Sequence, residues 1–290
     1  MKDRRNDNCA LDNKLKRIFS DEKIEYVSHI PYSACKETRG YMCERAGIKP
    51  KTVIVFAVPY YTGDGELISA YAVSRDYHTY MKALGERLCE KLSSEYPGCS
   101  FHTFADVSPI DERDACAKAG LGVFGDNGLL ITEKYSSYVF LGEVLTDASA
   151  ETFGEFTVYK IGECKKCGRC SKECPITREG CECISALTQK KGALSEEEKK
   201  LMVKYKTVWG CDICQRVCPY TEKAIKTGSI YTPIEFFCQD RIVFLDEEKI
   251  NAMSDDEFAK RAFAWRGRET ILRNVRIFAE TFSDKDVGTP

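Results

Sequence analysis

Two short cysteine runs constrain this chain more than any other feature of its sequence. The first has the pattern CxxCxxCxxxCP and extends from Cys164 to Pro175; the second has the pattern CxxCxxxCP and extends from Cys211 to Pro219. Paired runs that each end in Cys-Pro are typical of a bacterial ferredoxin fold with two 4Fe–4S clusters. Proline after the last cysteine turns the backbone away from the cluster. The pattern therefore predicts a protein that transfers electrons one at a time.

The second run is one cysteine short of the first, so a further ligand has to come from elsewhere in the chain. In two-cluster ferredoxins the cysteine before proline binds the other cluster. One cluster is therefore expected to bind Cys164, Cys167, Cys170 and Cys218. The other is expected to bind Cys174, Cys211, Cys214 and either Cys181 or Cys183, and spacing does not choose between the last two.

Zinc and disulfides are the alternative interpretations of these cysteines. A structural zinc site favours two CxxC pairs around one tetrahedral ion, which differs from three cysteines followed by a fourth at a longer gap. Disulfides need an oxidising compartment, and the charged start of the chain, Met1 to Asp7, has no apolar segment of a secretory signal. The clusters are therefore the favoured interpretation.

Length and composition set the outer limits. The chain has 290 residues, of which 43% are hydrophobic, and a formal net charge of −2, so bulk charge gives no argument for nucleic-acid binding. It contains no run of eighteen apolar residues that could span a bilayer. Sixteen cysteines without a secretory signal fit a reducing compartment, so we expect a cytoplasmic protein with no membrane partner.

The first half of the chain alternates between strand and helix patterns. Strands are predicted over residues 52–61, 99–105 and 137–145, and helices over 75–92 and 109–118. A last helix is predicted over 268–282. The expected fold is an α/β or α+β sandwich over residues 1–155, a double 4Fe–4S ferredoxin-like domain over 156–225, and a helical segment over 226–290 that packs on the core.

Several motifs along the chain resemble those of the epoxyqueuosine reductase family. They appear in order as Arg75-Asp-Tyr-His78, Asp106-Val-Ser-Pro-Ile-Asp-Glu-Arg113, Gly120-Leu-Gly-Val-Phe-Gly-Asp-Asn127, Phe140-Leu-Gly-Glu-Val-Leu-Thr-Asp147, the first cysteine run, Cys183-Ile-Ser-Ala-Leu-Thr188, and Trp209-Gly-Cys-Asp-Ile-Cys-Gln-Arg-Val-Cys-Pro219. The resemblance spans roughly residues 40 to 280. It implies two 4Fe–4S clusters, a cobalamin, and an amino-terminal domain similar to reductive dehalogenases.

The resemblance also implies roles for individual residues. Asp106 corresponds to the acid that protonates the departing epoxide oxygen, and Arg75, Tyr77 and His78 to residues that line the substrate pocket. The cofactor-binding positions are Gly122, Gly125 and Asn127, and the fourth ligand of the second cluster is Cys183 rather than Cys181. The implied partners are tRNA carrying epoxyqueuosine and an external electron donor such as flavodoxin or ferredoxin.

Each of these residues also has a structural interpretation. Asp106 is suited to capping a helix, and Tyr77 has the spacing of a core residue.

The chain departs from the family at Asp126, where a lysine is usual, and it stops before the helical-repeat domain that helps the better-known enzymes to hold tRNA. The basic surface that is left for RNA is a predicted strip of five arginines: Arg261, Arg266, Arg268, Arg273 and Arg276. The alternative functions are reduction of an unidentified small molecule and non-catalytic electron transfer.

Overall fold

The computed structural model describes residues 13–104, 107–155, 159 and 163–283. These fall into two compact units. The first comprises residues up to Pro59 and His78–Lys166, and the second comprises Tyr60–Tyr77 and the chain from Cys167 onward. The boundaries expected from the sequence, 1–155, 156–225 and 226–290, stay a prediction.

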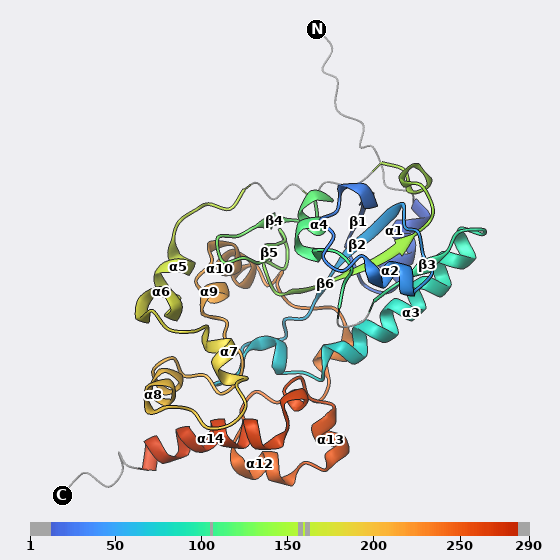
Figure 1. Cartoon of the computed structure of the whole chain (residues 1–290). Coiled ribbons are helices and arrows are strands. Elements are labelled where there is room, and N and C mark those ends of the chain that lie inside the picture. Colours follow the sequence, from blue (N-terminus) through green and yellow to red (C-terminus); the bar gives the residue numbers. More distant parts are fainter. Residues whose placement is uncertain (1–12, 105–106, 156–158, 160–162, 284–290) are drawn as a thin grey trace, which may run out of the picture. The chain divides into compact units, whose positions relative to one another are not determined.

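The first unit is built on one four-stranded sheet with strand order β1-β2-β6-β3, shown in Figure 1. All three pairings are antiparallel, which places the unit in the α+β form of the expected α/β class. Its elements are α1 (Asn13–Asp21), β1 (Tyr26–Pro31), η1 (Tyr32–Ala34), α2 (Tyr41–Arg45), β2 (Thr52–Pro59), α3 (Tyr77–Glu95), β3 (Phe101–His102), α4 (Glu112–Lys118), β4 (Val123–Phe124), β5 (Leu130–Ile131), β6 (Val139–Thr146) and η3 (Ala150–Phe153).

Helices cover both faces of this sheet. On one face, Val53 and Val55 of β2 and Leu145 of β6 share a buried cluster with Ala115 and Cys116 of α4. On the other face, the ring of Phe56 lies 5.3 Å from that of Phe19 in α1, and α3 approaches Gly142 through Met81. Strand β2 is buried along its whole length, as its continuous apolar sequence predicts.

Two predicted elements of this unit are at least three residues shorter in the structure. Strand β3 covers only Phe101–His102 of the predicted 99–105, because the hydroxyl of Thr103 donates to the Glu143 carbonyl in place of a backbone ladder bond. Helix α4 begins at Glu112 rather than Pro109, because the side chain of Asp111 caps it by accepting the backbone N–H of Asp114. Strand β1 was not predicted at all.

The second unit is helical in its described part. Its elements are η2 (Ala70–Ala72), α5 (Arg169–Glu173), α6 (Pro175–Glu179), α7 (Ile184–Thr188), α8 (Glu196–Lys204), α9 (Ile213–Arg216), α10 (Pro219–Lys226), α11 (Glu235–Cys238), α12 (Glu247–Ala252), α13 (Asp255–Ala259), η4 (Ala264–Arg266) and α14 (Arg268–Ser283). Trp209, Phe263 and Ile271 are fully buried in its core. The predicted last helix is confirmed as α14.

A buried asparagine ties three segments of this second unit together. The amide of Asn274 in α14 donates to the carbonyl of Thr188 at the end of α7 and to that of Val208, at 2.7 and 2.8 Å. Asn274 is fully buried, so both carbonyls depend on it for their hydrogen bonds. The end of α7 and the segment before the second cysteine run are therefore hydrogen-bonded to helix α14. None of the described helices has the length and apolar character needed to cross a membrane.

Candidate functional site

The two cysteine runs have the same local structure. In each run a short helix leads to a cysteine, a proline follows, and that proline starts the next helix: α5–Cys174–Pro175–α6 and α9–Cys218–Pro219–α10. The backbone angles φ and ψ are −66° and 127° at Cys174 and −72° and 129° at Cys218. This is the extended conformation that proline imposes on the residue before it. Helices α5 and α9 also pack against each other, so the runs form an internal repeat.

Four of the predicted ligands of one cluster come together in the second unit. Burial, together with the nearby thiols of Cys211 and Cys174, raises the pKa of Cys214 to about 12. Burial also raises the pKa of Cys211 to about 11, with contributions from Asp212, Cys183 and Cys174. Thiols that shift one another's pKa in this way lie close together. The positive charge of iron stabilises neighbouring thiolates, so this donor set fits an iron–sulfur cluster.

The alternative ligand Cys181 has a different environment. Its thiol donates a 3.5 Å hydrogen bond to the Pro175 carbonyl, and Cys174 and Cys183 contribute to its raised pKa after burial itself. Cys183 is exposed at the start of α7. Of the two, only Cys183 contributes to the pKa shift of Cys211. This arrangement favours Cys183, and the assignment stays a prediction.

The remaining predicted ligands are spread over the two units. Cys170 contributes to the pKa shift of Cys214, Cys167 is exposed and Cys218 is buried. Cys164 belongs to the first unit. Among the described residues, no three His, Cys, Asp or Glu side chains have the geometry to hold a single metal ion. A cubane differs from such a site because each of its four irons takes its own thiolate.

The second cysteine run is anchored to residues 68–71 of the same unit. The carboxylate of Asp212, which lies between Cys211 and Cys214 in sequence, accepts the backbone N–H of Ala70 at 2.6 Å and the hydroxyl of Ser69. The backbone N–H of Ser69 donates to the Trp209 carbonyl at 2.8 Å. Burial raises the pKa of Asp212, and the bonds from Ser69 and Ala70 oppose that rise. These contacts were not predicted from the sequence.

The predicted substrate residues Arg75 and Tyr77 follow directly on this anchored segment. Arg75 donates from Nε to Oδ2 of Asp240 at 2.7 Å, so its ion-pair partner comes from far along the chain. The ring of Tyr77 meets that of Tyr71 edge-on, with centroids 6.3 Å apart. His78 is half-buried and belongs to the first unit. Asp106 lies outside the described residues, so its predicted role as the acid stays a prediction.

The predicted cofactor-binding residues Gly122, Gly125 and Asn127 lie in the β4–β5 hairpin. A side chain at Gly122 would place its Cβ 2.4 Å from the Ile131 carbonyl oxygen, which explains the glycine. The Gly125 N–H donates to the Leu129 carbonyl at 2.9 Å, and Oδ1 of Asn127 accepts the Leu129 N–H at 3.2 Å. These contacts are made within the hairpin itself and do not test corrin binding. That role stays a prediction based on resemblance.

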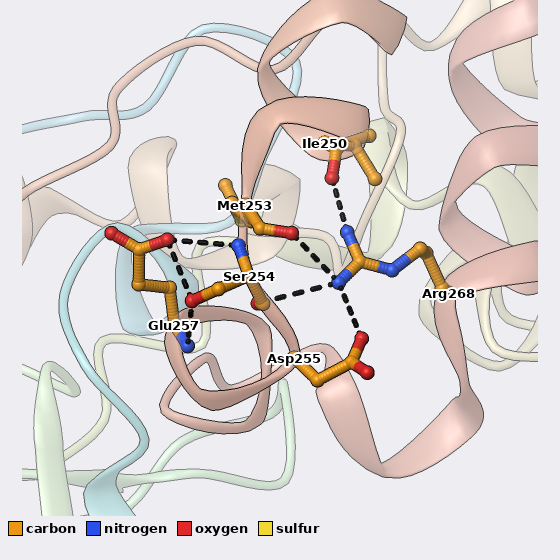
Figure 2. Close-up of polar contacts among 6 residues, drawn as sticks. All are labelled: Ile250, Met253, Ser254, Asp255, Glu257 and Arg268. Carbon is orange, nitrogen blue, oxygen red and sulfur yellow. Dashed lines mark hydrogen bonds and ion pairs between the residues drawn. The ribbon is translucent and has the colours of Figure 1, made fainter.

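Four of the five arginines in the predicted basic strip are engaged within their own unit, and Arg261 donates to the Asp240 carbonyl at 2.5 Å. Figure 2 shows Arg268 donating to the carbonyls of Ile250, Met253 and Ser254 and to the Asp255 carboxylate. Arg273 donates to the carbonyls of Lys190 and Gly192, and Arg276 pairs with Glu247 at 2.6 Å. Arg266 instead lies 3.9 Å over the ring of Trp265, which is 56% exposed.

The chain is similar to curated epoxyqueuosine reductases. Residues 44–107 match the family model "Epoxyqueuosine reductase QueG, DUF1730". The epoxyqueuosine reductase of Gloeobacter violaceus is 30% identical over 223 residues, which are 72% of this chain and 69% of that protein. This chain belongs to the epoxyqueuosine reductase family. It is also 34% identical to the Pseudomonas aeruginosa member, over 74% of this chain and 61% of that protein.

Solved structures of the family have the same fold. The epoxyqueuosine reductase of Streptococcus thermophilus superposes with a TM-score of 0.72 at 21% identity, covering 91% of this chain and 79% of that one. An epoxyqueuosine reductase with an epoxyqueuosine-modified tRNA-Tyr stem loop superposes with a TM-score of 0.68 at 20% identity, covering 90% and 80%. The sequence similarity to the Gloeobacter violaceus protein confirms the expected family. This chain covers less than two thirds of the length of several other relatives, including 43% of the Aliivibrio fischeri member.

Proposed function

We propose that this chain reduces the epoxide of epoxyqueuosine in tRNA to the alkene of queuosine, with electrons passing through two 4Fe–4S clusters. The observation that carries the proposal is the repeated Cys-Pro helix pair with four thiols gathered beside it, in a chain of this family. The clusters bind Cys164, Cys167, Cys170 and Cys218, and Cys174, Cys183, Cys211 and Cys214. The site of action is the cytoplasm.

The reaction consumes two electrons and two protons, and the epoxide oxygen leaves as water. Cobalamin, when bound, supplies a strongly reducing cobalt at the substrate. The protein has to protonate the departing oxygen, because an alkoxide is a poor leaving group in an apolar pocket. Asp106 is the proposed acid, and burial of a carboxyl keeps it protonated near neutral pH. Arg75, Tyr77 and His78 orient the substrate, and Gly122, Gly125 and Asn127 contact the cofactor.

The proposed RNA contact is the exposed indole of Trp265 together with the half-buried side chain of Arg266. An exposed indole with a guanidinium on its face is a stacking surface for an unpaired base, and the charge attracts phosphate. Arg266 lies close to the ring of Trp265, whereas Arg268, Arg273 and Arg276 are already engaged. The electrons come from an external donor such as flavodoxin or ferredoxin.

Anaerobic reconstitution with iron, sulfide and hydroxocobalamin tests this function. After desalting, we expect about eight irons and one cobalt per chain, as two cubanes and one cobalamin require. Reduced protein is then incubated with tRNA carrying epoxyqueuosine, and the nucleosides are analysed by mass spectrometry for conversion to queuosine. About eight irons without retained cobalt, and no conversion, would favour the alternative of a two-cluster electron carrier. Retained cobalt without conversion would favour a small-molecule substrate.

A further inference from the structure

The motif that begins with Cys183 ends in a threonine to which the proposed function gives no role. Thr188 is the last residue of α7 and is fully buried. Its hydroxyl donates to the Ser185 carbonyl at 2.8 Å and accepts the backbone N–H of Gly210 at 3.0 Å. Cys211 follows Gly210 directly. One hydroxyl therefore joins the helix that follows Cys183 to the segment that leads into Cys211.

The side chain of Asn274 joins the same two segments. Its Nδ2 atom donates to the carbonyl of Thr188 at 2.7 Å and to that of Val208 at 2.8 Å. Its Oδ1 atom accepts two bonds from the guanidinium of Arg273, at 3.0 Å from Nε and at 2.7 Å from a terminal nitrogen. A carboxamide has two donor hydrogens and two acceptor lone pairs, so this amide is fully used. Aspartate has no N–H and leucine has no polar atom, so neither could make these bonds.

The backbone of Gly210 is held by hydrogen bonds on both of its sides. Its φ of +73° lies in the left-handed region that favours glycine, and a Cβ there would lie 2.5 Å from the Cβ of Ser69. Its N–H donates to Thr188, and its carbonyl accepts the hydroxyl of Thr207 at 2.7 Å. That carbonyl belongs to the peptide bond that joins Gly210 to Cys211. Two threonine hydroxyls therefore set the orientation of the chain where the second cysteine run begins.

We propose that Thr188 and Asn274 are positioning residues for one of the two clusters. They hold the segment before Cys211 at one place along α7, so that the thiols of Cys183 and Cys211 reach the same cluster. The inference rests on the proposed function, because it takes these two cysteines as ligands of one cluster. Apolar packing in the shared core is not directional, whereas a hydrogen bond requires both a distance and an angle. The two polar side chains therefore add a register that the core alone does not define.

The role of Thr188 is tested by the release of iron to a ferrous chelator from the full chain, reconstituted anaerobically with iron and sulfide. Thr188→Val keeps the shape of the side chain and removes the hydroxyl, whereas Thr188→Ser keeps the hydroxyl. In Thr188→Val we expect about four of about eight irons to leave faster and the others to leave at the wild-type rate. The faster phase should be about 10–100-fold above wild type, the usual effect of losing a group that orients metal ligands. Thr188→Ser should behave like wild type. Wild-type release from Thr188→Val would overturn the proposal.

A matched core variant separates positioning from general stability. Asn274→Leu removes both bridging bonds, and Ile271→Ala shortens a fully buried side chain of the same helix and the same core. We expect both variants to unfold at lower urea than wild type, and only Asn274→Leu to release half of its iron faster. The same faster release from Ile271→Ala, at an equal loss of urea stability, would show that the bridge has no special role.

These experiments need no RNA, so they fail independently of the proposed function. Faster release from Thr188→Val, without conversion of epoxyqueuosine by wild type, would support the positioning role while the proposed function fails. Conversion by wild type, with unchanged iron release from Thr188→Val and Asn274→Leu, would overturn the positioning role and leave the function standing.

Discussion

The indole N–H of Trp209 donates a 2.8 Å hydrogen bond to the hydroxyl of Tyr71. Trp209 is fully buried and precedes the second cysteine run by two residues, and Tyr71 lies on the segment that Asp212 anchors. The edge of Tyr71 then meets Tyr77. One partly buried hydrogen bond and one ring contact thus connect the predicted cluster-binding segment to a predicted substrate residue inside the same unit.

Replacement of Tyr71 with Phe should therefore affect catalysis more than cluster binding. The variant leaves the Trp209 N–H without its acceptor, which costs about 1–3 kcal/mol. It thereby breaks the link between Trp209 and the Tyr71–Tyr77 ring pair while leaving every cysteine in place. We expect normal iron content, lower stability and a lower kcat in the tRNA assay. The control is Tyr205→Phe, whose hydroxyl binds Glu179 at the surface. Loss of iron in Tyr71→Phe would mean that the bond serves the cluster instead.

The choice between Cys181 and Cys183 can be decided by iron content. Only Cys183 contributes to the pKa shift of Cys211, whereas the thiol of Cys181 donates to the Pro175 carbonyl. We expect Cys183→Ser to retain about four irons per chain after anaerobic reconstitution and Cys181→Ser to retain about eight. The two variants make the same chemical change two residues apart, so each controls for the other. The reverse pattern would assign the ligand to Cys181.

Sequence patterns predicted the regular elements well where hydrophobic periodicity decides them. The continuous apolar run of β2, the last helix α14 and the buried positions Leu84, Leu88 and Leu92 of α3 all agree with the structure. Strand β3 is shorter than predicted because the Thr103 side chain takes the place of a ladder bond. Such an exchange leaves no periodic signal in the sequence.

For a related reason, the sequence predicted only part of the candidate site. Cysteine spacing is local, so the ligand runs could be recognised directly, and the family motif suggested Cys183. The anchor between Ser69 and Asp212 joins residues 143 positions apart. These partners are set by tertiary packing.

A cluster of ion pairs around Glu22 makes the stability of the first unit depend on pH in the acidic range. Glu22 accepts from Arg87 at 2.9 Å and from Lys91 at 2.6 Å. Burial raises the pKa of Glu22, but the two cations outweigh burial, so the net pKa is lowered from 4.5. A lowered folded pKa means that the stabilisation is present above pH 4.5 and is lost as pH falls through the folded value.

Glu22→Gln should therefore be less stable than wild type by about 1–2 kcal/mol at neutral pH, with the difference shrinking below pH 4.5. Urea unfolding at several pH values measures it. Glu25→Gln is a suitable control, because Glu25 makes one exposed ion pair with Lys134. A difference that stays constant down to low pH would show that the charge of Glu22 is not the cause.

RNA binding at Trp265 and Arg266 gives the last prediction. If an unpaired base stacks on the indole, Trp265→Ala should weaken tRNA binding by about 1–3 kcal/mol, the usual worth of one stacked base. The change should be nearly independent of salt, whereas Arg266→Ala should also make log Kd less steep against log salt, by about 0.7–0.9 if it contacts one phosphate. Fluorescence anisotropy with a labelled anticodon stem loop, between 50 and 200 mM salt, separates the two effects. Arg276→Ala is the control, because Arg276 is already paired with Glu247. Equal binding by wild type, Trp265→Ala and Arg266→Ala would move the RNA contact to another surface.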